Sequence, residues 1–419
     1  MLYNVNKRSK RNKYFNTYGE ILQYLFRIGG KILKVVGIIC EYNPLHNGHI
    51  YHINETKRLI GEDTAVVCAM SGNFVQRGET AVFSKFARAK AAVKCGADLV
   101  IELPLETSLS SAEGFARGGV KLLDALGVCT HLSFGSEEGD AGKLEKIAKA
   151  LLVPEMDELI KKELESGVSY AAARQKALRR VLGETADIIE KPNNILGIEY
   201  LKALEIIHSD MQPVTVSRFG GDHDGETGYS ASAVRAGLLE GCADWSTVPE
   251  KAAEVFKKEI EEGRGPAFTK NIETAMLYRL RTMTEDEYDT LPFASEGLGQ
   301  RLKKSVISSA TLDEILEKTK TKRYAMSRIR RMIMCAYLGV TAEDMNTSPA
   351  YIRVLAATEK GRELLKKMRK TAKLPVITKP AAAKDHLNGK DSDLYTLAYP
   401  NSTQRLCGTD FTTSPYMEK

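Results

Sequence analysis

The chain has 419 residues, enough for two or three domains, and it is 43% hydrophobic and 27% charged, as ordinary globular proteins are. No apolar run reaches the roughly 18 residues of a membrane span, so the sequence predicts no transmembrane helix. The net charge of +6 is a weak sign of a polyanionic partner. Seven scattered cysteines without a C-x-x-C pair argue against a disulfide framework or a zinc site and favour reduced thiols in a cytoplasmic protein.

The first 33 residues are basic, with Lys7, Arg8, Lys10, Arg11 and Lys13 close together. Residues 18–28 have the spacing of a short amphipathic helix, but the segment lacks the long apolar core and cleavage site of a signal peptide. We expect an extension that takes no part in the fold, and a weak RNA-binding tail is the alternative.

The most informative stretch runs from residue 35 to residue 52. Its apolar, β-branched run Val35–Cys40 predicts a strand that is buried on both faces. A turn at 41–44 follows, and His46, Gly48 and His49 then open a segment with helical spacing. A helix N-terminus offers unpaired N–H groups to phosphate, glycine permits close approach, and imidazoles three residues apart lie on one face. Two such histidines are as often simple capping residues, but the buried strand before them favours a nucleotide phosphate site.

Strands and helices alternate from residue 35 to about residue 139. The pattern predicts further strands at 64–70, 98–104 and 130–137, and helices at 84–96 and 112–126. This βαβ order predicts a parallel sheet with helices on both faces, whose ligands gather at the carboxyl ends of the strands. Polar and glycine residues fall at those ends, at 43–49, 71–77 and 135–136.

A second helix start follows a fifth predicted strand at 213–218. Ser230 or Ser232 would cap this helix, and Arg235 lies in its first turn. Paired hydroxyls with an arginine at a helix N-terminus can hold nucleotide phosphates. Taken alone, the pattern fits an ordinary N-cap with a surface arginine better.

From about residue 242 to residue 365 the sequence is mostly amphipathic helix with Tyr324 and Tyr337 among many basic residues. The basic residues are Arg301, Lys303, Lys304, Lys318, Lys320, Lys322, Arg323, Arg328, Arg330 and Arg331. Such a surface suits the phosphates of RNA or DNA, and a solvated helical face is the alternative. The last fifty residues show no pattern that assigns them a role.

Seven ordered blocks give the chain a resemblance to a known family. They are GIICEYNPLHNGHIYH, MSGNFVQRGE, SKFARAKAA, DLVIELP, FGSE, PNNILGIEY and SASAVR. The strand before His46-x-Gly48-His49, with Ser230-x-Ser232-x-x-Arg235 downstream, resembles the nucleotidylyltransferase superfamily. The blocks together resemble the bacterial tRNA(Met) cytidine acetate ligases from about Lys34 to the C-terminal end.

The resemblance implies an α/β fold: a Rossmann-like parallel-sheet nucleotidylyltransferase domain of the HIGH type at 34–240, then a mainly α-helical, basic, tRNA-binding region at 241–419. Residues 1–33 fall outside it. It also implies a ligase that makes acetyl-adenylate and pyrophosphate from ATP and acetate. The acetyl group then passes to the wobble cytidine of elongator tRNA(Met) and gives N4-acetylcytidine. Mg²⁺ is expected with the ATP, since it bridges phosphates and needs few protein ligands.

The resemblance assigns site residues by position. We expect His46 and His49 to be catalytic through the charge that develops on the phosphates. The ATP-binding residues it implies are Ile39, Cys40, Glu41, Tyr42, Asn43, Pro44, Leu45, His46, Asn47, Gly48, His49, Ile50, Tyr51, His52, Gly135, Asn194 (or its neighbour Asn193) and Arg218. Further phosphate contacts are expected at Lys85, Ser232 and Arg235. The residues expected to bind tRNA are Lys322, Arg323, Arg328, Arg330 and Arg331.

Two other functions stay open on the sequence. A small-molecule adenylyltransferase accounts for the first 240 residues but leaves the basic helical region without a role. A non-catalytic RNA-binding protein with a vestigial nucleotide fold accounts for the basic region but not for the intact histidine pair.

Overall fold

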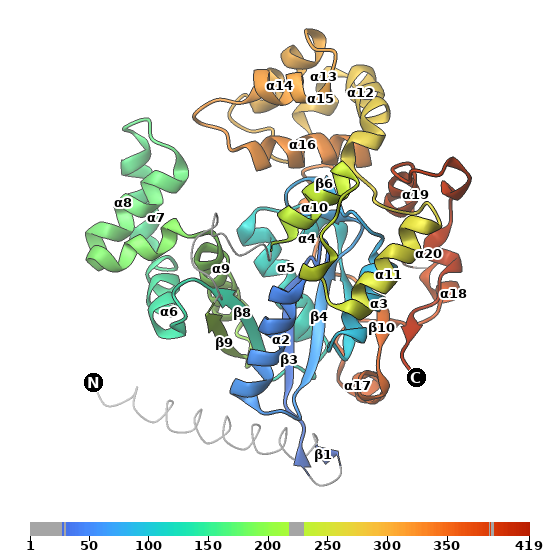
Figure 1. The fold of residues 1–419 in the computed structure, drawn as a ribbon. Coiled ribbons are helices and arrows are strands. Elements are labelled where there is room, and N and C mark those ends of the chain that lie inside the picture. The colour runs from blue at the N-terminus through green and yellow to red at the C-terminus, as the bar shows by residue number, and fades with distance from the viewer. Residues whose placement is uncertain (1–26, 29–30, 218–229, 385, 387–388) are drawn as a thin grey trace, which may run out of the picture.

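The computed structural model describes residues 27–28, 31–217, 230–384, 386 and 389–419, and its centre is an eight-stranded sheet (Figure 1). The sheet has the order β11-β10-β7-β4-β3-β8-β9, and β12 also pairs with β10. The parallel strands are β3 (Val35–Cys40), β4 (Ala65–Ser71), β7 (Leu99–Leu103), β8 (His131–Ser136) and β9 (Gln212–Ser217). Their carboxyl ends therefore meet at one edge of the sheet.

Helices cover both faces of this sheet. Consecutive residues of a strand point to opposite sides, so the apolar strands contribute to a hydrophobic core on each face. Val35 and Val67 face one core, which includes residues of α5 (Ala112–Ala125), α6 (Ala141–Ala150), α9 (Pro192–Ile207) and α17 (Glu359–Thr371). Val36 and Cys68 face the other, which includes residues of α2 (Asn47–Ile60), α3 (Lys85–Lys94), α10 (Ala231–Glu240) and α11 (Glu250–Glu261). The Rossmann-like fold class predicted from the sequence is confirmed.

The C-terminal part of the chain returns to the same sheet. β10 (Ile352–Ala357) pairs antiparallel with β7, and β11 (Val376–Ile377) and β12 (Tyr416–Met417) pair in parallel with β10. Every residue of β10 is buried. The prediction of a mainly helical C-terminal part is confirmed, but this strand within it was not predicted, because a short apolar run fits a buried strand as well as a helix. The predicted boundary at residue 240 thus divides the chain between two parts that share one sheet.

Two groups of helices project from the sheet (Figure 1). α7 (Pro154–Leu164) and α8 (Tyr170–Leu182) pack on each other at one side. The other group, which we call the helical lobe, consists of α12 (Glu273–Thr282), α13 (Glu285–Asp289), α14 (Leu298–Ile307), α15 (Leu312–Thr319) and α16 (Met326–Leu338). The core of the lobe includes Phe74 of β5 (Phe74–Val75) and Tyr395 of α19 (Lys390–Thr396), so the lobe packs directly on a loop of the sheet domain.

The remaining elements are short. They are β1 (Arg27–Ile28), β2 (Lys31–Ile32), β6 (Glu79–Thr80), α4 (Leu105–Ser108), η1 (Gly183–Glu190), η2 (Trp245–Thr247), η3 (Thr269–Ile272), η4 (Asp344–Asn346), α18 (Pro380–Ala383), η5 (Ser402–Gln404) and α20 (Thr409–Thr412). Within the described ranges, no helix has the length and apolar character needed to cross a bilayer. All seven cysteines lie in those ranges and carry free thiols.

Candidate active site

The loop after β3 lies at the carboxyl edge of the sheet and is held from several sides. Tyr42 has a positive φ of 46°, and its buried hydroxyl lies 3.4 Å from Sγ of Cys68. Asn43 is buried, and its Oδ1 accepts a hydrogen bond from the N–H of Val82 at 2.8 Å. The peptide bond between Asn43 and Pro44 is cis. These contacts fix the direction in which the chain enters α2.

His46 is the N-cap of α2, and His49 completes a capping box with it. Nδ1 of His46 accepts a hydrogen bond from the N–H of Gly48 at 3.0 Å, and Nδ1 of His49 accepts one from the N–H of His46 at 3.1 Å. Serine or threonine with glutamate usually fills these two roles. The first turn of α2 contains no acidic side chain, so nothing in that turn neutralises the positive end of the helix dipole.

These hydrogen bonds also set the tautomer of both rings. A ring nitrogen that accepts from a backbone N–H carries no hydrogen, so each neutral imidazole has its hydrogen on Nε2. The centroids of the His46 and His49 rings are 3.8 Å apart, and the ring of Tyr42 lies edge-on to His49 at 4.8 Å. Both Nε2–H groups are therefore donors of the kind that phosphate oxygens at a helix start require.

The other residues predicted in this stretch differ in burial. Cys40 and Leu45 are buried, and burial raises the pKa of the Cys40 thiol well above its ordinary value. Tyr51 is exposed one turn further along α2, and Nε2 of His52 lies 2.9 Å from Oγ of Ser133 in β8. Of the other residues predicted in this stretch, Pro44 is buried, and the half-buried ones are Ile39, Glu41, Asn47, Gly48 and Ile50. The structure thus brings the histidine pair and Gly48 together and leaves Tyr51 and His52 along the helix.

Arg88 of α3 was not predicted as a site residue, yet it joins the loops around the site. Its fully buried guanidinium donates to the backbone carbonyls of Glu41 at 2.6 Å, Ser71 at 3.1 Å and Phe83 at 2.9 Å, and to that of Gly72. One side chain therefore connects the ends of β3 and β4. Burial lowers its pKa. The only signal in the sequence is a charged residue at an alanine-rich helix position within the SKFARAKAA block.

Glu41 follows β3, and three arginines act electrostatically on its carboxylate. Its Oε1 accepts a hydrogen bond from the N–H of Gln76 at 2.7 Å. Burial raises the pKa of Glu41, and the charges of Arg88, Arg235 and Arg77 act in the opposite direction. The carboxyl edge of the sheet is consequently rich in positive charge at this point, which favours an anionic ligand.

The start of α10 lies against the loop before α2. Ser230 is the N-cap of α10. Nη1 of Arg235 donates to the carbonyl oxygen of Asn43 at 2.7 Å, and Nη2 donates to Oγ of Ser232 at 3.1 Å. Ser232 and Arg235 are therefore brought to the histidine-bearing loop. Arg218, predicted to bind ATP, lies outside the described residues.

Gly135 lies near the carboxyl end of β8, beside the residues of α9 predicted to bind ATP. Oδ1 of the buried Asn194 accepts from the N–H groups of Glu137 at 2.9 Å and Glu138 at 3.1 Å, and its Nδ2 donates to a backbone carbonyl at 3.0 Å. These polar atoms shape the loop after β8. Asn193 is half-buried, with Nδ2 2.6 Å from Oε1 of Glu137, and it is the more accessible asparagine.

Lys85, predicted as a phosphate contact, lies in the interior instead. Its side chain is 1% exposed, and Nζ lies 2.7 Å from Oε1 of Glu102 and 2.9 Å from Oδ1 of Asp410. Arg353 of β10 lies 2.9 Å from the same Asp410 oxygen. Two cations thus balance two carboxylates beneath α3. We correct the prediction for Lys85: its ammonium group joins the C-terminal segment to the sheet.

Two arginines of α16 predicted to bind tRNA contact the sheet domain. Arg330 forms an ion pair with Glu79. Nη1 of Arg331 donates to the carbonyl oxygen of Gln76 at 3.3 Å, and its guanidinium lies 5.0 Å from the centroid of the Phe293 ring. Burial lowers the pKa of Arg331 to about 10. These two side chains therefore hold the helical lobe against the loop after β4, and their predicted role in binding tRNA stays a prediction.

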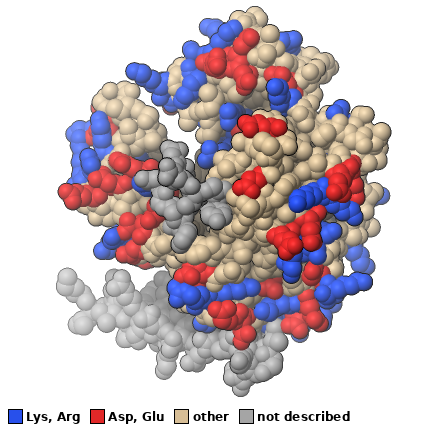
Figure 2. Space-filling model, viewed as in Figure 1, with Lys and Arg blue, Asp and Glu red and all other residues tan. Residues whose placement is uncertain are grey.

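The other basic candidates of the lobe are more accessible. Lys322 and Arg323 are exposed, and Arg323 lies 3.3 Å from a carboxylate oxygen of Glu296. Arg328 is partly buried and donates to the carbonyl oxygen of Phe293 at 3.0 Å. Figure 2 shows Lys and Arg interspersed with Asp and Glu over the lobe. The exposed basic surface near the start of α16 is thus narrower than the sequence predicts.

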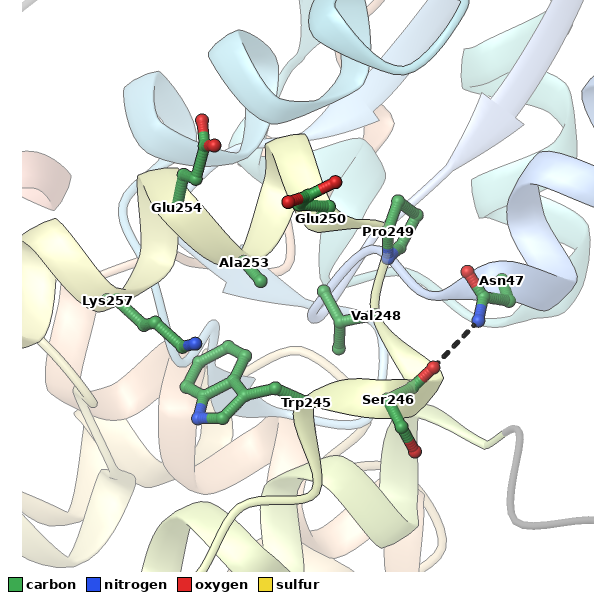
Figure 3. A pocket seen from close by; sticks show the side chains of 9 residues that line it. All are labelled: Asn47, Trp245, Ser246, Val248, Pro249, Glu250, Ala253, Glu254 and Lys257. Carbon is green, nitrogen blue, oxygen red and sulfur yellow. Dashed lines mark hydrogen bonds between the residues drawn. The ribbon is translucent and has the colours of Figure 1, made fainter.

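A cavity of 540 Å³ lies beside the start of α2 (Figure 3). Nδ2 of Asn47 donates to the carbonyl oxygen of Ser246 at 3.1 Å, and Nζ of Lys257 lies 5.5 Å from the centroid of the Trp245 ring. The lining residues are Asn47, Trp245, Ser246, Val248, Pro249, Glu250, Ala253, Glu254 and Lys257. Because Asn47 belongs to the first turn of α2, the cavity shares a wall with the histidine site.

Comparisons with known proteins agree with this geometry. The HIGH Nucleotidyl Transferase family model matches residues 33–410. A tRNA(Met) cytidine acetate ligase of Acetivibrio thermocellus is 38% identical over 411 residues, covering 91% of this chain and 99% of that protein. A tRNA(Met) cytidine acetate ligase of Caldanaerobacter subterraneus is 40% identical over 392 residues, covering 88% of this chain and 96% of that protein. The crystal structure of Thermotoga maritima TmcAL bound with alpha-thio ATP is 35% identical, with a TM-score of 0.86, and covers 92% of this chain and 99% of that one.

The parallel sheet and the histidine-capped helix after its central strand define a nucleotidyl transferase of the HIGH type. Within that class, the chain belongs to the tRNA(Met) cytidine acetate ligase family. The resemblance predicted from the sequence blocks is confirmed.

Proposed function

We propose that this protein is an ATP-dependent ligase that activates acetate as acetyl-adenylate and transfers the acetyl group to the wobble cytidine of elongator tRNA(Met). The observation that carries the proposal is the pair of histidines at the start of α2, which cap the helix through Nδ1 and present Nε2–H. The full-length similarity to acetate ligases supports the choice of acid and acceptor.

In the first step, a carboxylate oxygen of acetate attacks the α-phosphorus of ATP. A new P–O bond forms as the bond to the β-phosphate oxygen breaks, and pyrophosphate leaves with the electron pair. No protein nucleophile is required, so positioning and charge stabilisation supply the catalysis. His46 and His49 would donate to the phosphate oxygens, and Arg235, held at Asn43, would add a fixed positive charge.

In the second step, the N4 amine of cytidine attacks the carbonyl carbon of acetyl-adenylate. The C–N bond forms, AMP leaves, and the amine loses one proton. The base must leave its stack to reach the anhydride, as bases do in other enzymes that modify them. The accessible basic residues Lys322 and Arg323 would contact RNA phosphates at a distance from the chemistry.

The remaining ATP contacts are proposed from position: the loop of residues 39–52, Gly135, Asn193 or Asn194, and Arg218. Among the described residues, no group of three or more His, Cys, Asp or Glu side chains could hold a metal ion. That arrangement fits Mg²⁺ arriving on the triphosphate as MgATP, held by phosphate oxygens and water. A cytoplasmic location stays a prediction.

One assay tests the proposal against its alternatives. The protein is incubated with labelled acetate, ATP and bulk tRNA, and label is measured in cytidine after digestion of the RNA. Label in N4-acetylcytidine that requires ATP is the expected result. Pyrophosphate exchange that needs another acid would instead indicate a small-molecule adenylyltransferase. Absence of both signals would leave a non-catalytic RNA-binding protein.

A further inference from the structure

Arg77 lies on a turn that is fixed on three sides. The N–H of Gln76 donates to Glu41 at the end of β3, and the carbonyl oxygen of Gln76 accepts from Arg331 of the helical lobe. On the other side of Arg77, Gly78 has a φ of +75° and its N–H donates to the carbonyl oxygen of Val75 at 2.9 Å. The backbone that carries Arg77 is therefore held between the sheet and the lobe.

The Arg77 side chain itself is exposed, and in the described part of the chain it has no hydrogen bond or ion pair. Its charge nevertheless acts on the site. Burial lowers the pKa of Arg235, Glu79 and Glu41 oppose that change, and the positive charge of Arg77 lowers it further. Arg77 also acts to lower the pKa of Glu41. Arg77 therefore adds a positive charge to the surroundings of Arg235 and Glu41 while making no hydrogen bond or ion pair among the described residues, and such a charge favours an anion.

The turn lies on a particular side of the site. The histidines follow β3 and Gly135 lies on β8, which neighbours β3 on one side. The Arg77 turn follows β4, which neighbours β3 on the other side. An in-line displacement places the attacking oxygen and the leaving pyrophosphate on opposite sides of the α-phosphorus. With the nucleotide over β3 and β8, the attacking acid would approach over β4.

We propose that Arg77 binds the carboxylate of the acid substrate and directs it to the α-phosphorus. This assignment rests on the proposed function and adds the acid subsite to it. Acetate and the α-phosphate are both negative, so a guanidinium between them reduces their repulsion as they approach. A guanidinium also accepts a carboxylate in a two-pronged hydrogen bond, which fixes the direction of attack. After the P–O bond has formed, the same group lies beside the anhydride carbonyl.

The test compares Arg77→Ala and Arg77→Lys with the unchanged protein in acetate-dependent ATP–pyrophosphate exchange. Because Arg77 is exposed, both variants should fold, which thermal unfolding verifies. We expect Arg77→Ala to raise KM for acetate about 20- to 100-fold while KM for ATP changes less than about twofold. Arg77→Lys keeps the positive charge but loses the two-pronged guanidinium, so its KM for acetate should lie between those of the unchanged protein and Arg77→Ala.

The matched control is Arg369→Ala. Arg369 is also exposed, and it lies on α17. The strand before α17 is β10, which ends beside the amino end of β7, so α17 begins away from the site. Its KM for acetate should not change.

Three results would overturn the assignment. An unchanged KM for acetate in Arg77→Ala would exclude the acid subsite while leaving the ligase function intact. Weaker tRNA binding with normal acetate kinetics would make Arg77 an RNA contact. A selective rise in KM for ATP would make it a nucleotide contact. The proposed function would fail separately, and the acid subsite with it, if the unchanged protein showed no acetate-dependent exchange.

Discussion

A Cβ atom on Gly78 would lie 2.5 Å from the carbonyl carbon of Arg330, so the backbone of α16 rests directly on the turn after β5. The same Cβ would lie 2.5 Å from the backbone nitrogen of Arg331. Backbone atoms cannot move aside as the end of a long side chain can. This contact joins the helical lobe to the turn that carries Arg77, and the hydrogen bond from Arg331 to Gln76 reinforces it.

The first prediction concerns Gly78→Ala. The variant combines a φ of +75° with a backbone clash, and we expect it to lower the free energy of unfolding by about 2 to 4 kcal/mol. Gly183→Ala is the matched control, because Gly183 has a φ of +62° with nothing within 4 Å of the added Cβ, so it should cost only about 1 kcal/mol. Denaturant unfolding measures both. Equal losses in the two variants would show that the contact with α16 does not limit stability.

The second prediction separates the two roles of His49. In His49→Asn, the side-chain oxygen can replace Nδ1 as acceptor for the N–H of His46, but nothing replaces Nε2. We expect the rate of acetate-dependent pyrophosphate exchange to fall at least about 100-fold, while the free energy of unfolding changes by less than about 0.5 kcal/mol. In His49→Gln, the side-chain amide nitrogen can reach the position of Nε2, although the side chain then no longer accepts from the N–H of His46. Part of the exchange activity should therefore return.

Binding of tRNA provides the check on His49. Both variants should bind tRNA nearly as the unchanged protein does, because neither substitution touches the helical lobe. Full exchange activity in His49→Asn would show that the outer ring nitrogen takes no part in the chemistry.

The sequence predicts the sheet and the helix start at the histidine pair well, because both depend on local patterns. The apolar run at 35–40 and the glycine and histidine spacing at 46–49 are adjacent in the chain. The capping box is not predictable in this way, since it depends on the ring orientations of His46 and His49.

Contacts between distant residues escaped prediction for a different reason. Lys85 looks like a site cation until Glu102 and Asp410 surround it, and Asp410 is contributed by the far end of the chain. Arg331 is predicted from its charge to bind tRNA, and its contact with Gln76 forms only when the lobe folds onto the turn after β5. In both cases the charge of the side chain is evident in the sequence, but the partner is not.

The third prediction is a pH dependence of stability at the buried charge cluster. Burial raises the pKa of Asp391 to about 6, Lys85 opposes that rise, and Asp410 and Glu102 add to it. The folded pKa lies above the ordinary value, so the stabilisation from this proton is complete below about pH 4 and is lost as pH rises through about 6. Asp391→Asn stays neutral and should exceed the unchanged protein in stability by about 1 to 3 kcal/mol at pH 7.5.

Denaturant unfolding at about pH 4.5 and about pH 7.5 measures this difference, which should shrink at the lower pH. Asp313→Asn is the control, because Asp313 is an exposed aspartate in the first turn of α15, as Asp391 is in the first turn of α19. It should change stability about equally at both pH values. A loss of stability in Asp391→Asn at pH 7.5 would show that the ionised carboxylate is required by its cations.

The fourth prediction concerns the basic residues of the lobe. Lys322 and Arg323 are exposed, so replacing both with alanine should weaken tRNA binding and reduce the slope of log K against log salt by about 1.4 to 1.8. Replacing these two residues should change the free energy of unfolding by less than about 0.5 kcal/mol. Arg331→Ala should do the reverse: it removes the contacts with Gln76 and the Phe293 ring, so it should destabilise the protein by about 1 to 3 kcal/mol and leave the salt slope unchanged.

Filter binding of tRNA at several salt concentrations, with denaturant unfolding of each variant, distinguishes these effects. Arg369→Ala on α17 serves as control for the removal of one exposed positive charge. If the Lys322 and Arg323 double variant keeps the full salt slope while Arg331→Ala reduces it, the RNA surface lies at the junction of the lobe and the sheet. The contact between Arg331 and Gln76 would then have to open when tRNA binds, because the guanidinium cannot serve both partners with the same donors.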